Sequence, residues 1–165
     1  MGARLTVLVL ILGAVSGFTS EAAGTPETAA VDTVLTAFHA AAAEADGETY
    51  LGLLADDAVF IGTDPSERWT ADEFAAFASP YFAEGRGWTY TASDRHIRIA
   101  PGGSVAWFDE MLWNDAYGIC RGTGVLLLTE NGWRIVQYHL TFPIPNELSR
   151  ELTTRIREHS SRSAD

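Results

Sequence analysis

Two pairs of residues in the second half of the chain, each an acid and a partner, are of the types that do chemistry. Asp109 and His139 lie on segments that alternate apolar and polar residues, as neighbouring strands do. A histidine oriented by a carboxylate is the arrangement of a general base. Glu110 and Arg121 form the second pair, in which a fixed guanidinium would hold the carboxylate or polar tail of a ligand beside Tyr138.

The turns next to these segments determine which residues face one another. Asn131-Gly132 is a strong signal for a two-residue type I′ turn, and Asp115-Ala116 can form the preceding turn. Counting outward from the two turns pairs Gly124 with His139, Gly122 with Thr141, Trp107 with Gly124, and Asp109 with Gly122. Because a glycine leaves space opposite the histidine, we expect the His139 ring to border a cavity or a subunit interface rather than solid core.

Side chains alternate along strands, so the two pairs occupy opposite faces of the sheet. One face carries Trp107, Asp109, Met111, Gln137 and His139, and the other carries Phe108, Glu110, Arg121, Thr123, Tyr138 and Leu140. Both faces contain large apolar residues, and a change of one residue in either turn would reassign them, so the pattern does not decide which face lines the interior.

The two face assignments predict different functions. An interior Asp109–His139 pair predicts an acid–base enzyme, whereas an interior Glu110–Arg121 pair predicts a binding site. For either pair, the alternative is a buried polar residue that a neighbour satisfies. The expected ligand pocket draws on Trp107, Glu110, Arg121, Tyr138 and His139, with Asp109 and His139 catalytic only if the protein is an enzyme.

The periodicity predicts helices in the first half of the chain and mainly strands in the second. Three helices are expected near 26–45, 47–54 and 70–82, and Pro80 is expected to kink or end the third early. The expected strands are 58–62, 88–99, 104–114, 119–129 and 133–142. Helices followed by hairpin-linked strands are typical of an α+β domain. A cone-shaped curved antiparallel sheet wrapped around two to three N-terminal helices fits this order best.

Two segments resemble the SnoaL-like branch of the nuclear transport factor two-like superfamily. They are LLADDAVFIGTDPSERW at 53–69, where Asp64 and Glu67 are expected to brace a loop, and NGWRIVQYHLTFPIPNE at 131–147. The resemblance covers about residues 28 to 146. It implies a cone that opens into an apolar pocket with a few polar groups, commonly in a homodimer packed through its sheets.

The resemblance implies several functions, because this fold hosts isomerases, cyclases, hydrolases and oligomerising modules. We favour a domain that binds a small, largely apolar molecule and self-associates. The alternative is a small enzyme related to ketosteroid isomerases and polyketide cyclases, with an acid–base pair in its pocket.

Composition narrows the choice of partners. The chain has 165 residues, 47% of them hydrophobic and 20% charged, which is enough for one globular core, and its formal net charge is −11. Nucleic acid is a poor partner for so acidic a chain, because binding depends on Lys and Arg that neutralise phosphates. The histidines show no metal-site spacing and no nucleotide-binding motif is present, so no metal and no cofactor is expected.

The N-terminal residues have the pattern of a secretory signal. Arg4 precedes the apolar run Leu5–Gly13, which is shorter than the ~20 residues of a membrane span, although an uncleaved anchor is the alternative. We expect a signal peptide over 1–23, a SnoaL-like domain over 24–146 and a helical or frayed tail over 147–165. The protein would then be secreted or periplasmic, with no stable membrane insertion after cleavage. Cys120 is the only cysteine, so no internal disulfide can form.

Overall fold

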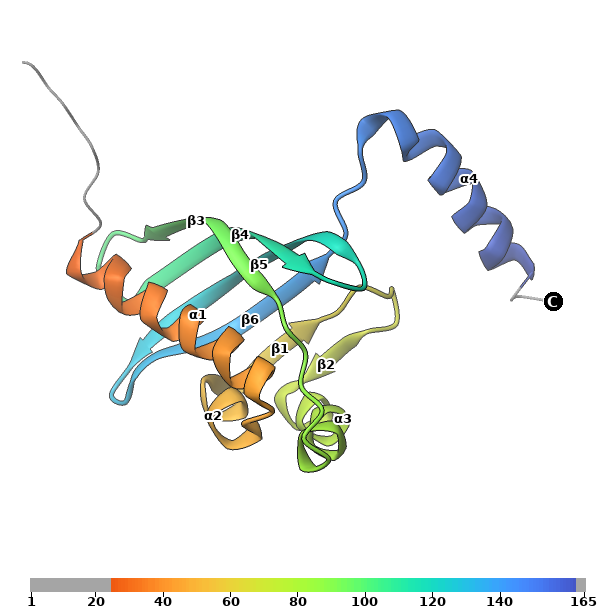
Figure 1. Cartoon of the computed structure of the whole chain (residues 1–165). Helices are drawn as coiled ribbons and strands as arrows, with labels where there is room; N and C mark the ends of the chain where they lie inside the picture. The colour runs from red at the N-terminus through yellow and green to blue at the C-terminus, as the bar shows by residue number, and fades with distance from the viewer. Residues whose placement is uncertain (1–24, 163–165) are drawn as a thin grey trace, which may run out of the picture.

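The computed structural model describes residues 25–162, and the predicted signal peptide lies outside them. In chain order the elements are α1 (Pro26–Glu44), α2 (Gly47–Gly52), β1 (Leu54–Ile61), β2 (Arg68–Thr70), α3 (Ala71–Ala83), β3 (Thr91–Ile99), β4 (Val105–Asn114), β5 (Gly118–Thr129), β6 (Gly132–Thr141) and α4 (Asn146–Arg162), as Figure 1 shows. The three N-terminal helices and the four long strands lie close to their predicted ranges. The short strand β2 was not predicted.

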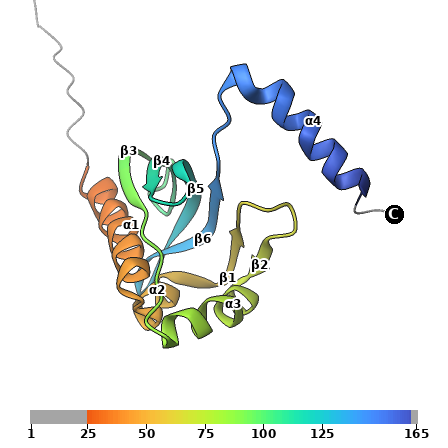
Figure 2. The ribbon, with the colours of Figure 1, turned by 45° about the vertical axis from the view of Figure 1, so that its right-hand side comes forward.

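The six strands form one curved sheet in the order β2-β1-β6-β5-β4-β3. Neighbouring strands are antiparallel except β1 and β6, which run parallel. The helix α1 packs against β3 and β6, and α3 packs against β1, so these N-terminal helices cover one face of the sheet, whereas α4 stands away from it (Figure 2). We call the uncovered side the open face. This is the α+β architecture that the sequence predicts.

Local sequence explains where the helices begin and end. Thr25 caps α1 by accepting a hydrogen bond from the backbone N–H of Thr28, and a capping box starts α3. Pro80 lies inside α3, which continues to Ala83, so of the kink or early end predicted there, the early end is wrong. The side of α3 around Pro80 is exposed, and water can satisfy the carbonyl that the missing N–H leaves free.

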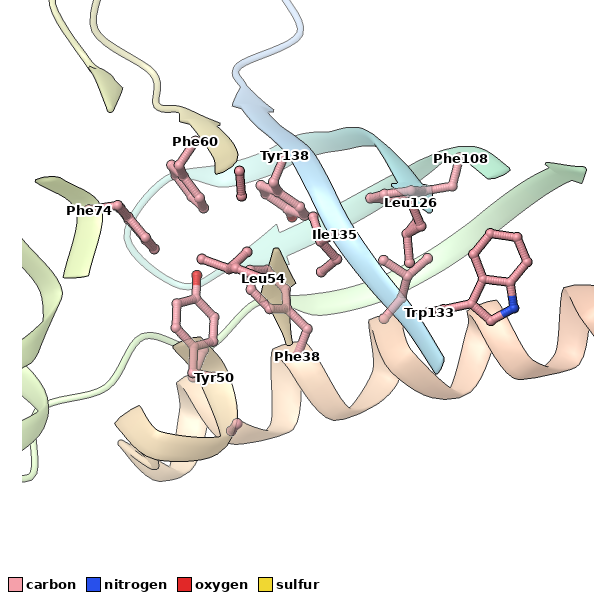
Figure 3. Close-up of a cluster of buried hydrophobic side chains, with 14 of the residues drawn as sticks. Phe38, Tyr50, Leu54, Phe60, Phe74, Phe108, Leu126, Trp133, Ile135 and Tyr138 are labelled. Atoms are coloured by element: carbon pink, nitrogen blue, oxygen red, sulfur yellow. The ribbon is translucent and has the colours of Figure 1, made fainter. Parts of the chain in front are cut away.

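The core lies between α1, α2, α3 and the covered face of the sheet (Figure 3). Aromatic rings fill it. Phe60 stacks on Phe74 with centroids 3.9 Å apart and on Tyr138 at 5.3 Å, and Phe38 stacks on Tyr50 at 4.2 Å. The covered face is therefore the one that carries Tyr138.

The hairpin between β5 and β6 differs from its predicted register. Its turn consists of Glu130 and Asn131, and β6 then skips Val136 in a bulge. Together the earlier turn and the bulge move the register by one residue, so the pairings predicted for His139 and for Gly122 are wrong. The residues that face one another are Gly124 and Tyr138, Thr123 and His139, Gly122 and Leu140, and Arg121 and Thr141.

The hairpin between β4 and β5 also has a longer turn than predicted. Three residues, 115–117, connect the strands, and Gly118 follows with φ +72, a conformation that favours glycine. The side-chain oxygen of Asn114 accepts hydrogen bonds from the backbone N–H groups of Ala116 and Tyr117, which fixes this turn. The pairings predicted for Trp107 and Asp109 are therefore wrong. The actual pairs are Trp107 with Val125, Phe108 with Gly124, Asp109 with Thr123, and Glu110 with Gly122.

Candidate functional site

Glu110 is the one charged residue that is buried among those the structure describes, with 1% of its surface exposed. Its Oε1 atom accepts a hydrogen bond from Nε2 of His39 at 2.6 Å, and its Oε2 atom accepts one from Nε of Arg95 at 2.7 Å. Because a carboxylate can only accept, Nε2 of His39 carries the hydrogen. Both oxygens are satisfied, which offsets the cost of burying the charge.

Arg95 reaches this position because the edge strand β3 is irregular. The pairing of β3 with β4 shifts between Ser93 and His96, and Asp94 has φ +47, which is uncommon for a residue other than glycine. After this bulge Arg95 points to the same side as Ile97, against α1. The bulge therefore converts a residue of an edge strand into an interior cation.

Arg95 also ties the sheet to the first helix. Its Nη1 atom donates to Oδ1 of Asp32 at 2.8 Å and to Oγ1 of Thr36 at 3.0 Å. Burial alone would lower the pKa of Arg95, but Glu110 and Asp32 outweigh it and the pKa is raised. Asp32, His39, Glu110 and Arg95 thus form a four-residue network, which we call the buried ion cluster. It joins α1, β3 and β4.

Tyr138 lies next to this cluster. Burial, together with the nearby Glu110 carboxylate, raises its pKa well above the ordinary value, so the hydroxyl stays protonated. A Cβ atom at Gly122 would lie 2.7 Å from the Tyr138 hydroxyl and 3.0 Å from Oε1 of Glu110. The glycine therefore leaves the space in which the two polar groups lie.

A second feature is a cavity of about 300 Å³ that is open to solvent at Phe77, Tyr81 and Tyr117. Eight aromatic residues and Leu140 supply its apolar walls, and they come from β1, β2, α3, the segment before β3, the turn between β4 and β5, and β6. The lining residues are Phe60, Gly62, Thr63, Glu67, Trp69, Phe74, Phe77, Tyr81, Trp88, Tyr90, Tyr117 and Leu140. We call this the aromatic cavity. Its volume and composition are those of a small-molecule site, mostly apolar with a few polar groups.

The aromatic cavity and the buried ion cluster are separate. None of the four cluster residues lines the cavity. Tyr138 links them, because its ring contacts that of His39 with centroids 6.3 Å apart and stacks on Phe60, a cavity residue, at 5.3 Å. The cluster instead borders a polar hollow of about 330 Å³ between α1 and β3, lined in part by Asp32, His39 and Arg95.

The structure places the residues predicted for the site on both faces of the sheet. Glu110 and Tyr138 lie in the interior, whereas Trp107, Asp109, Arg121 and His139 lie on the open face. Arg121 is therefore not the partner of Glu110, and its guanidinium contacts the sulfur of Met111 at 3.6 Å. Asp109 and His139 are separated by Thr123 on β5, which pairs with both. His139 faces Thr123 and not a glycine, which removes the reason for expecting a cavity beside it.

The true partners of Glu110 were missed. His39 follows Phe38 at the edge of the apolar stripe of α1, where a histidine can reach the interior. Arg95 alternates with Ile97 and Ile99, an apolar pattern that could have indicated an inward side chain. In the cavity, Glu67 does brace its loop as predicted, because its Oε2 accepts the backbone N–H of Asp64 at 3.0 Å.

Sequence comparison places this fold in a family. Residues 31–145 match the model of the SnoaL-like domain. The chain belongs to the SnoaL-like domain family. A search of curated proteins found no match.

Solved structures share the fold of this SnoaL-like domain. A domain of unknown function with a cystatin-like fold from Nostoc punctiforme has a TM-score of 0.65 at 17% identity, over 86% of this chain and 96% of the other. A proposed dehydratase of the NTF2-like family from Streptomyces avermitilis has a TM-score of 0.57 at 19% identity, over 72% and 97%. A proposed scytalone dehydratase from Novosphingobium aromaticivorans has a TM-score of 0.60 at 12% identity, over 72% and 85%. Identities this low establish the fold alone.

Proposed function

We propose that this chain is an exported SnoaL-like domain that binds a small, largely apolar molecule in the aromatic cavity and self-associates through the open face of its sheet. The observation that carries the proposal is the lining of the cavity, in which aromatic rings predominate around about 300 Å³ of space. Burying an apolar ligand against such rings is favourable by roughly 25 cal/mol for each Å² removed from water.

The cavity favours binding over catalysis because its lining holds no acid–base pair. Its ionisable groups are the Glu67 carboxylate and three tyrosine hydroxyls. Burial raises the pKa of Tyr90 to about 12, so this phenol does not act as a base near neutral pH. The acid–base pair of the interior, His39 with Glu110, lies outside the lining.

Ligand retention tests the binding proposal. The wild type, the variant Trp69→Ala and the control variant Trp113→Ala are purified without denaturation and examined by native mass spectrometry. Trp113 is a suitable control because it is 53% exposed and does not line the cavity. The wild type and the control should carry an additional small-molecule mass, and Trp69→Ala should lose it. Equal retention by both variants, or no mass on any of them together with no binding of added apolar compounds, would contradict the proposal.

Self-association is supported by apolar side chains on the open face. Trp107, Trp113, Ile119 and Leu127 are each more than a third exposed there, and an exposed apolar surface of this kind is typical of interaction sites. Trp107→Glu should shift the protein toward monomer in sedimentation velocity. The control Leu148→Glu, at a residue of similar exposure on α4, should not. A wild type that is monomeric at high concentration would refute this part.

Export is proposed from the N-terminal pattern alone. Among the described helices, none is long and apolar enough to cross a membrane. N-terminal sequencing of protein recovered from the cell envelope or the medium should show a new terminus near Ala22–Gly24. Protein that keeps Met1 and stays in the cytoplasm would refute export.

A small enzyme of the ketosteroid isomerase or polyketide cyclase type is the second candidate. The observation that favours it is the buried His39–Glu110 pair, an imidazole oriented by a carboxylate in a water-poor interior. The Asp109–His139 pair is a weaker candidate, because Thr123 separates the two residues on the open face. A compound that the wild type converts and that His39→Gln binds but does not convert would support this function.

A further inference from the structure

Eight of the residues that line the aromatic cavity are aromatic, and several of their rings contact one another. Trp69 stacks on Phe77 with centroids 5.1 Å apart and an interplanar angle of 17°, and Phe77 contacts Tyr81 at 5.4 Å. Trp88 and Tyr90 lie in the segment just before β3, and they also line the cavity. Ring faces carry partial negative charge, so such a surface attracts a cation as well as apolar groups.

The single charged group in the lining is also negative. Glu67 is the only acidic residue in the lining, and the lining contains no Lys, Arg or His. Its carboxylate is held in a fixed place, because Oε2 accepts the N–H of Asp64 and lies so close to Gly62 that a Cβ there would be only 2.2 Å away. Within residues 25–162, none of the six ion pairs found includes Glu67.

Charges around the cavity include one cation of the protein, because the Arg86 guanidinium lies over the Tyr81 ring, 4.7 Å from its centroid, and pairs with Glu84. Burial is the main cause of the raised pKa of Tyr90, with smaller contributions from Cys120, Tyr117 and, last, Glu67. The chain as a whole carries a formal net charge of −11. A ligand with a carboxylate or phosphate would therefore enter against both local and overall repulsion, whereas a cation would be attracted.

We propose that the aromatic cavity is selective for organic cations, namely amines or quaternary ammonium compounds with an apolar body, which bind with the cationic group against Glu67 and the tryptophan and tyrosine rings. This inference deepens the proposed binding function and rests on it. Neutral apolar molecules of the same shape would bind through the rings alone, and anions of the same shape would be excluded.

A matched set of probes tests the selectivity. Benzyltrimethylammonium is compared with neopentylbenzene, in which carbon replaces the charged nitrogen, and with phenylacetate as the anion. Binding is measured through tryptophan fluorescence at low ionic strength. The cation should bind at least ~10-fold more tightly than its neutral isostere, because a ring-bound cation beside a carboxylate gains that much. Phenylacetate should bind most weakly.

Two variants locate the source of the selectivity. Glu67→Gln keeps an oxygen that can accept the Asp64 N–H, and it should bring the cation and the isostere within about threefold of each other. Glu130→Gln removes the same charge from the distant turn between β5 and β6, and it should leave the ~10-fold preference intact. Trp69→Leu should weaken both probes.

The outcomes separate this inference from the function on which it rests. If the isostere binds as tightly as the cation and Trp69→Leu weakens both, the cavity binds apolar molecules but the cation preference is refuted. If Glu67→Gln and Glu130→Gln lower the preference equally, net charge and not the cavity is responsible, which also refutes the inference. If neither probe binds, both proposals fail.

Discussion

Replacing Glu110 by Gln should destabilise the protein far more than replacing its neighbour Asp109 by Asn. The two residues are adjacent on β4 and undergo the same chemical change, but they lie on opposite faces of the sheet. Glu110 is buried in the ion cluster, whereas Asp109 is exposed on the open face. The comparison therefore tests the face assignment and the cluster together.

The expected size of the effect follows from the contacts of Glu110. Removing one partner of a buried ion pair costs about 3–5 kcal/mol. The amide of Gln can still accept one hydrogen bond from Arg95, and Arg95 keeps its contact with Asp32 at 2.8 Å. The amide N–H₂ would, however, face the Nε2–H of His39, donor against donor. We therefore expect a loss near the lower limit, about 3 kcal/mol, against less than about 0.5 kcal/mol for Asp109→Asn.

Urea unfolding followed by circular dichroism measures both values. With a dependence on urea of about 1–3 kcal/mol per molar, Glu110→Gln should lower the midpoint by roughly 1–3 M, and Asp109→Asn should leave it nearly unchanged. Similar midpoints for the two variants would refute the reasoning, because they would show that the buried cluster contributes no more to stability than an exposed carboxylate.

Three further predictions concern packing, pH and the tail. Gly122→Ala should lower the free energy of unfolding by about 1–3 kcal/mol, because the new Cβ would lie 2.7 Å from the Tyr138 hydroxyl. The control Gly52→Ala should be nearly neutral, because a Cβ there meets nothing within 4 Å. Equal urea midpoints for the two variants would contradict the close packing at Gly122. The pKa of Tyr90 is raised from 10.0 to about 12, so the folded state keeps a proton that the unfolded chain releases. The free energy of unfolding should stay constant below pH 10 and fall between pH 10 and pH 12, and it should fall less steeply in Tyr90→Phe. Identical pH dependence of the unfolding free energy in the wild type and the variant would argue against the raised pKa of Tyr90. Deleting residues 146–165 should leave the urea midpoint unchanged because α4 has no buried residue, and a large decrease would show that the tail docks.

The sequence predicted the elements well and the pairing of strands less well, for physical reasons. Periodicity and caps such as Thr70 with Glu73 act within one element, so they can be read locally. The register of β6 depends on a turn at Glu130 and a bulge at Val136, each of which moves every later side chain. No composition signal distinguishes Val136 from its neighbours.

The candidate site was predicted only in part, for the same reason. Glu110 and Tyr138 were identified and share the interior face, but Arg121 was assigned as the partner of Glu110 through the incorrect register. The actual cation, Arg95, points inward because of the bulge at Asp94, and His39 comes from a helix far away in the sequence. Periodicity could have placed Arg95 and His39 on inward faces, but the contacts that join them to Glu110 are tertiary and are not contained in periodicity or hairpin counting.

Indole N–H resonances test the central claim, that the aromatic cavity is the ligand site, most directly. The chain has five tryptophans. Trp69 and Trp88 line the cavity, Trp107 and Trp113 are exposed outside it, and Trp133 is in the core. On titration with benzyl alcohol, the account predicts saturable shifts of the Trp69 and Trp88 signals while the other three stay in place. Shifts confined to Trp107 and Trp113, or no saturable shift at any tryptophan, would contradict it.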